Sequence, residues 1–266
     1  MKKAVGLLLA LLLVFAAVTP GFAASGYSDL ISSILDDMSS NNARCSGAPQ
    51  QAANGVYRLV EMLAVIALED GNAKASELVT GILEDRDANN ARCSGAPQQT
   101  ANGAYRCAEM LAVIALVNDS SGVYGDLITG VLDDMSSNNA SCNGAPQQIA
   151  NGLYRCVELL AIIAYELDSG NRYSDLISGV LDDMSFNNAR CSGAPQQQAN
   201  GAYRMVELLS IIAMEKNTSG RYTDLISGVL DDMSKNDKSC NGAPQQLANG
   251  LYRCVEMASV IAIANQ

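Results

Sequence analysis

The twelve residues Gly47-Ala-Pro-Gln-Gln-Ala-Ala-Asn-Gly-Val-Tyr-Arg58 occur in nearly the same form five times in this chain. The pattern Gly-Ala-Pro-Gln-Gln-x-Ala-Asn-Gly-x-Tyr-Arg returns at Gly95, Gly144, Gly193 and Gly242, first after 48 residues and then every 49. Because the flanking residues also match, the chain consists of five copies of one unit. Repeats of this period are typical of stacked proteins, in which no unit can bury its hydrophobic face alone.

A different kind of sequence precedes the first copy. Lys2 and Lys3 are followed by an apolar run over residues 4–18, and then by Pro20 and the segment Gly21-Phe22-Ala23. This order predicts a signal peptide over residues 1–23, cleaved after Ala23. An uncleaved membrane anchor is the weaker alternative, since the run is shorter than the roughly 20 apolar residues that a span needs. With no later span in the sequence, we expect a secreted or periplasmic bacterial protein.

The remaining residues, 24–266, are predicted to form a single repeat domain. We place its units at residues 27–74, 75–123, 124–172, 173–221 and 222–266. Each unit opens with apolar residues spaced by three and one, as in Tyr27, Leu30, Ile31 and Ile34, which indicates one face of an α-helix. The middle of this first helix holds glycine in four copies, at Gly81, Gly130, Gly179 and Gly228. Since glycine weakens a helix, we expect another helix to cross closely there.

A second, longer helix should begin at Pro49, because proline is preferred in the first turn of a helix. It extends to about Leu68 and is apolar around most of its circumference, which is typical of a helix buried on several sides. The pair Asn54-Gly55 leaves two alternatives open, since it could end a short first helix or lie within a continuous one.

Two helices per unit, joined by short loops and repeated five times, predict an all-α fold, an α-solenoid similar in architecture to HEAT and armadillo proteins. Solenoids normally end in divergent units with a polar outer face. Here the last long helix keeps Leu251 and Val255, and the first short helix keeps Leu30 and Ile34. Both ends could therefore associate with each other between molecules, while Ser33 and Ala258 favour a capped monomer.

A polar stripe follows the long helix of every unit. Its members are spaced by three, four and three residues, so they share one helix face. In the three central units they are Gln99, Asn102, Arg106, Glu109; Gln148, Asn151, Arg155, Glu158; and Gln197, Asn200, Arg204, Glu207. Two interpretations remain open. Arginine and glutamate could pair with each other while the amides bond between units, or the stripes could line a groove that binds an extended partner.

The eight cysteines occupy two positions of the unit. One, before the proline, is filled in all five copies, and the other, within the long helix, in three. Pairing within a unit gives Cys93 with Cys107, Cys142 with Cys156, and Cys240 with Cys254, and we prefer it for an exported chain. Pairing to the next unit (Cys45 with Cys107, Cys93 with Cys156, Cys191 with Cys254) and fully reduced, buried thiols are the alternatives.

One position inside the fixed motif varies, reading Ala52, Thr100, Ile149, Gln198 and Leu247 in successive units. Such variation can indicate selective binding. The preferred interpretation is an unconstrained surface site.

Composition limits the chemistry. The 17 basic residues less the two leader lysines, against 28 acidic ones, leave the mature chain at −13, which argues against nucleic-acid binding. Histidine is absent, and the acidic pairs such as Asp133-Asp134 lack the spacing of a calcium loop. We expect no catalytic residue, no metal and no cofactor, because a feature repeated five times is scaffold rather than one asymmetric active site. The sequence favours a protein-binding or self-assembling scaffold over an enzyme or a small-ligand carrier.

Overall fold

The computed structural model describes residues 27–71, 73–119 and 122–265, and within these ranges it contains ten helices and no strands. The predicted signal peptide lies outside the described residues. A shorter and a longer helix alternate along the chain, as the sequence predicts. The shorter ones are α2 (Ser28–Asn42), α4 (Ala73–Asn90), α6 (Gly125–Ser141), α8 (Ser174–Arg190) and α10 (Thr223–Asp237). The longer ones are α3 (Ala48–Asp70), α5 (Ala96–Asn118), α7 (Ala145–Leu167), α9 (Ala194–Lys216) and α11 (Ala243–Ala264).

The repeated motif builds the start of each longer helix. Gly47 precedes the first turn of α3, and Pro49 lies within that turn. The side-chain oxygen of Gln50 accepts a hydrogen bond from the backbone N–H of Ser46 at 2.7 Å, which satisfies a donor just ahead of the helix. The helix then continues without a break through Asn54 and Gly55, so the continuous alternative is the correct one.

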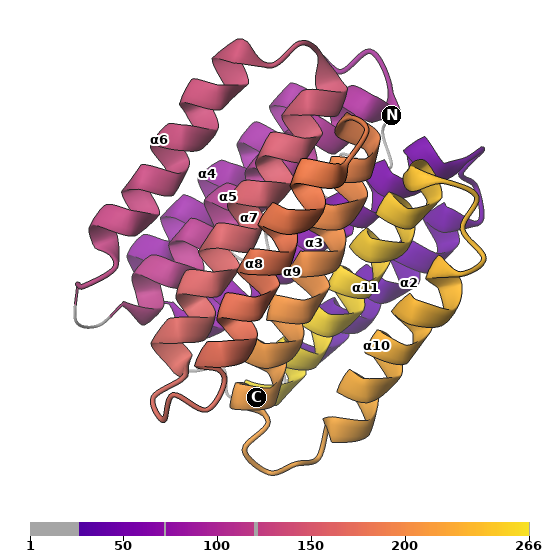
Figure 1. Ribbon diagram of the computed structural model, residues 1–266. Helices are drawn as coiled ribbons and strands as arrows, with labels where there is room; N and C mark the ends of the chain where they lie inside the picture. The colour runs from indigo at the N-terminus through magenta and orange to yellow at the C-terminus, as the bar shows by residue number, and fades with distance from the viewer. Residues whose placement is uncertain (1–26, 72, 120–121, 266) are drawn as a thin grey trace.

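The five longer helices form a closed inner ring. In space α3 packs on α5, α5 on α7, α7 on α9, α9 on α11, and α11 returns to α3. Each shorter helix lies outside this ring, against the longer helix of its own unit and that of the preceding unit; α2 accordingly contacts both α3 and α11 (Figure 1). The all-helical prediction is confirmed, but the open ends of a solenoid are not found, because the first and last units contact each other.

The closing contact between α11 and α3 matches the contacts inside the chain. At an internal contact, a Cβ added to Gly152 of α7 would lie 2.9 Å from the side chains of Ala104 and Tyr105 on α5. At the closure, a Cβ added to Gly55 of α3 would lie 2.8 Å from Tyr252 of α11. The glycine of the repeated motif therefore allows neighbouring inner helices to approach closely at every contact around the ring.

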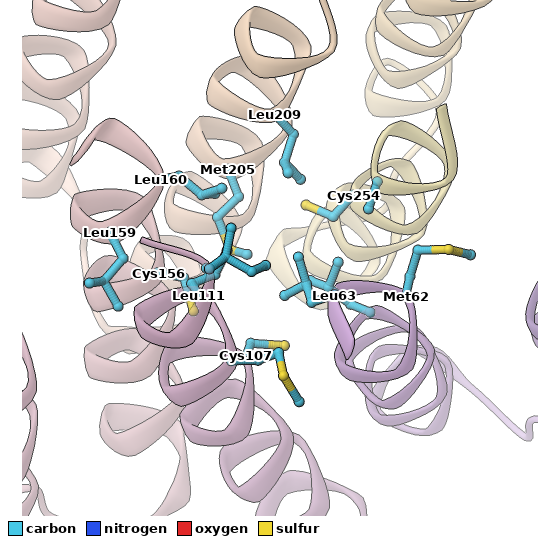
Figure 2. Close-up of a cluster of buried hydrophobic side chains, with 14 of the residues drawn as sticks. Met62, Leu63, Cys107, Leu111, Cys156, Leu159, Leu160, Met205, Leu209 and Cys254 are labelled. Carbon is cyan, nitrogen blue, oxygen red and sulfur yellow. The ribbon is translucent and has the colours of Figure 1, made fainter. Parts of the chain in front are cut away.

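Apolar side chains fill the ring. Figure 2 shows Leu63, Leu111, Leu160, Leu209 and Cys254, one from each inner helix, in a common cluster. Each of them is at most 1% exposed. The prediction that the longer helices are buried on several sides is confirmed, because each contacts two inner neighbours and two outer helices.

The glycines in the middle of the shorter helices do not mark a close crossing, contrary to the prediction. A Cβ added at Gly81, Gly130, Gly179 or Gly228 would meet nothing within 4 Å. In the described part of the chain the outer helices pack on inner helices rather than on one another. The glycine face of these four outer helices is consequently open.

One helix of the described residues, α11, is long and apolar enough to cross a membrane by length and composition. It is packed between α9 and α3, and 67% of its most apolar window is buried. Burial of α11 between α9 and α3 therefore accounts for its apolar character.

Candidate functional site

The polar stripe of each longer helix faces the outer helix of the same unit. In the central unit the guanidinium of Arg155 lies 2.9 Å from Glu158 on α7 and 3.6 Å from Asp134 on α6. Arg106 and Arg204 make the equivalent pairs with Glu109 and Glu207 at 2.8 and 2.9 Å. The expected pairing of arginine with glutamate is thus present in each of these units.

The amides of the stripe bind the end of the outer helix and connect neighbouring units. Asn151 donates to the carbonyl of Met135 at 3.0 Å, and Gln148 donates to Asn139 at 2.9 Å. Tyr105 of the preceding unit donates its hydroxyl to the same Asn139 at 2.7 Å. The same pattern recurs for Asn102, Asn200, Gln99 and Gln197. The stripe lies between the two layers of helices. Its asparagine also bonds to the preceding unit, as Asn102 donates to the hydroxyl of Tyr57 at 3.3 Å and Asn249 to that of Tyr203 at 3.2 Å.

One unit departs from this pattern at Arg86. The other four units hold methionine there, whereas Arg86 is 4% exposed and forms ion pairs with Glu61 of the preceding unit at 3.1 Å and with Asp87 at 3.0 Å. Glu61 also pairs with Arg58 at 2.8 Å, so its carboxylate is shared by two guanidinium groups. Removing one partner of such a buried ion pair would leave the other charge uncompensated and would destabilise the fold.

All eight cysteines are free in the structure, and the predicted disulfides within a unit are not formed. Cys93 lies in the loop between α4 and α5, where its thiol contacts the carbonyl of Asn89 at 3.3 Å. Cys107 lies about three turns into α5 and contacts the carbonyl of Val56 on α3 at 3.7 Å. The equivalent positions of Cys142, Cys156, Cys240 and Cys254 follow this arrangement. The two thiols of a unit are thus held apart by the length of α-helix between them.

The variable position of the motif lies at the mouth of the ring and not on an unconstrained surface, contrary to the preferred interpretation. Ala52, Thr100, Ile149, Gln198 and Leu247 are between 2% and 6% exposed, and with the five motif prolines they line a cavity of about 120 Å³. These five side chains share one space around the ring axis, so the size of each is constrained by the sizes of the other four.

Polar groups meet at the opposite end of the inner ring. Lys216 of α9 reaches across to Asp70 of α3, with nitrogen and oxygen 3.4 Å apart, and Asn265 donates to the same carboxylate at 3.3 Å. The helices α9 and α3 are not neighbours in the ring, so this ion pair spans its interior. The protein's own side chains thus fill the core of the inner ring and this end of it, and the cavity of about 120 Å³ lies at the other end.

The outer wall offers a larger groove. Between α6 and α8, over α7, it encloses about 470 Å³. Its apolar lining includes Leu127, Val131, Ile162, Tyr165 and Leu181, and its acidic members are Asp126, Asp134 and Glu158. Burial raises the pKa of Glu158 above its ordinary value, although Arg155 opposes the effect. This groove combines an apolar floor with negative charge.

This groove could not be predicted from the sequence, because its lining residues come from two outer helices and an inner one. No group of three or more Cys, Asp and Glu residues within the described ranges is arranged to hold a metal ion.

No family model matches the chain, and no curated protein or solved structure matches it either.

Proposed function

We propose that this protein is a non-catalytic scaffold, a five-unit α-solenoid closed into a ring, which binds other proteins through its outer wall. The observation that carries the proposal is the row of leucines on that wall. Leu78, Leu127, Leu176 and Leu225 occupy one position of four successive outer helices and are 46–57% exposed. Each is followed one turn later by a glycine with open space around it. Repeated apolar side chains on an uncovered surface support an interaction role.

The ends of the chain do not support self-assembly by stacking. The surfaces that would join two molecules end to end are α11 and the first unit, and these cover each other within one chain. We therefore prefer a partner protein over a second copy. The net charge of −11 supports neither nucleic acid nor an anionic membrane as the partner.

The location outside the cytoplasm remains part of this proposal, on the strength of the leader sequence over residues 1–23. A small-ligand carrier is the second candidate function. It is favoured by the cavity of about 120 Å³ at the ring mouth, whose largely apolar lining would take one small apolar group.

Site-specific photo-crosslinking in the producing cell tests the scaffold function. A photoreactive amino acid in place of Leu176 should give a covalent adduct of defined mass with a partner protein. Asp182 is exposed on another face of the same helix and is the matched control, where no adduct is expected. Absence of adducts at all four leucine positions would contradict the proposal.

A further inference from the structure

The carboxylate of Glu166, on the outer wall of the ring, is not paired in the described part of the chain. Both oxygens of Glu166, on α7, are buried and have no hydrogen-bond partner among the described residues. Glu166 follows Ile162, which lines the groove between α6 and α8, by one helical turn, so it lies beside the end of that groove without being one of its lining residues. A buried, uncompensated carboxylate is unfavourable, so its presence requires an explanation.

The next unit shows what is missing. There Glu215 occupies the position equivalent to Glu166, and Arg172 reaches it with nitrogen and oxygen 3.2 Å apart. The guanidinium of Arg172 also lies over the ring of Tyr173, 4.5 Å from its centre. Arg172 precedes Glu215 by 43 residues.

The residue at the same distance before Glu166 is Val123, which brings no charge and is 69% exposed. Tyr124, equivalent to Tyr173, is still present and lines the groove. The third unit thus keeps the carboxylate and the aromatic ring of this arrangement and lacks only the cation. In place of the arginine it presents an exposed apolar side chain.

We infer that the groove between α6 and α8 binds a basic, apolar segment of a partner protein, whose arginine or lysine lies beside Glu166 as Arg172 lies beside Glu215. The inference rests on the proposed scaffold function and names the partner chemistry of one groove. The apolar side chains of the segment lie on Leu127, Val131 and Leu181.

Charge complementarity decides the occupant. The acidic residues that line the groove are Asp126, Asp134 and Glu158, and of these Asp134 and Glu158 already share Arg155. Glu166 lies one helical turn beyond the lining residue Ile162 and adds a carboxylate beside the groove. Burial, with a smaller contribution from Asp119, raises the pKa of Glu166 to about 8, which agrees with a carboxylate that lacks a cation. An anionic or neutral segment would leave Glu166 uncompensated, whereas a cation compensates it and gains contact with Tyr124.

A displayed library of short random peptides, selected on the mature protein, tests this inference. The selected peptides should contain an arginine or lysine next to apolar residues, and its replacement by glutamine should weaken binding at least about tenfold. Val123→Arg supplies the cation from within the chain and should weaken binding by a similar factor. Val123→Thr, at the same exposed position and without charge, is the matched control and should bind as the wild type does.

Glu166→Gln should also lose the preference for basic peptides while it keeps its fold, checked by thermal unfolding. Selected peptides that lack basic residues, or that bind Val123→Arg as tightly as the wild type, would overturn the inference. If those peptides instead failed to bind the variants Leu176→Asp or Leu225→Asp, the scaffold function would stand without this site. A wild-type dimer that Val123→Arg converts to a monomer would show that the occupant is a second copy, and the inference would be wrong.

Discussion

The hydroxyl of Tyr252, in the last unit, donates a hydrogen bond to the side-chain oxygen of Asn42, in the first unit, at 2.8 Å. Tyr154 makes the equivalent bond to Asn188 at 2.9 Å between the third and fourth units. Burial raises the pKa of both tyrosines to about 12, so each hydroxyl stays a donor at ordinary pH. The bond that closes the ring is therefore of the same kind as those within the chain.

This equivalence predicts equal costs for two substitutions. Tyr252→Phe and Tyr154→Phe should each lower the free energy of unfolding by about 1 kcal/mol, because each removes the hydrogen bond from a tyrosine hydroxyl to an asparagine of the neighbouring unit. Urea denaturation measures both. If Tyr252→Phe had no effect while Tyr154→Phe destabilised the protein, the last unit would not be in contact with the first.

Two glycines should respond to alanine with opposite signs. Gly152→Ala places a methyl group 2.9 Å from Ala104 and Tyr105 and should destabilise the fold by about 1–3 kcal/mol. Gly130→Ala meets no atom within 4 Å and should stabilise α6 by about 0.5–1 kcal/mol through helix propensity. The melting temperatures of the two variants compare them directly. A stabilising Gly152→Ala would show that the inner helices are farther apart than described.

The thiols should divide into two classes. Cys107, Cys156 and Cys254 have no exposed surface, and burial raises the pKa of each, which suppresses the reactive thiolate. Cys45 and its four equivalents are only partly buried. A maleimide should therefore modify only the second class in the native protein, and all eight thiols after unfolding, as read by intact mass. Disulfide-linked masses in protein purified under oxidising conditions would contradict the free thiols of the structure.

Glu166 should make stability depend on pH. Its pKa is raised from 4.5 to about 8, so the fold favours the protonated carboxyl group. The stability that this group contributes is therefore fully present below pH 4.5 and is lost as the pH rises through 8. Glu166→Gln should raise stability at pH 8.5 by on the order of 1 kcal/mol, a value reduced for the solvent that screens this half-buried group. At pH 4 it should change little. Equal effects at both pH values would contradict an uncompensated carboxylate.

The sequence predicts the helices well because their signals are local. Pro49 fixes the start of α3, and the spacing of Leu30, Ile31 and Ile34 defines the buried face of α2. The pairing of Arg155 with Glu158 also follows from three-residue spacing on one helix. These features require no knowledge of how one unit rotates against the next.

Closure could not be predicted in the same way, because it depends on the angle between successive inner helices. That angle is set where Gly152 meets Tyr105, and a repeat pattern does not specify it. One signal was present: the last unit keeps Tyr252 and the first keeps Asn42, so each end retains its half of a contact between units. The unpaired state of Glu166 was not predicted for a related reason. Only the contact of Arg172 with Glu215 in the folded protein shows that Val123 stands where the next unit has a cation.

The distance between the first and last units tests the closed ring most directly. Ser40, Ser137, Phe186 and Lys235 are exposed and occupy one position of the first, third, fourth and fifth units. Spin labels can be introduced there in pairs through a non-natural amino acid, and the separations measured by pulsed electron resonance. The closed ring predicts that the Ser40–Lys235 separation equals that of the neighbours Ser137 and Phe186, and is shorter than Ser40–Ser137. A Ser40–Lys235 separation longer than both would show an open chain of repeats and contradict the account.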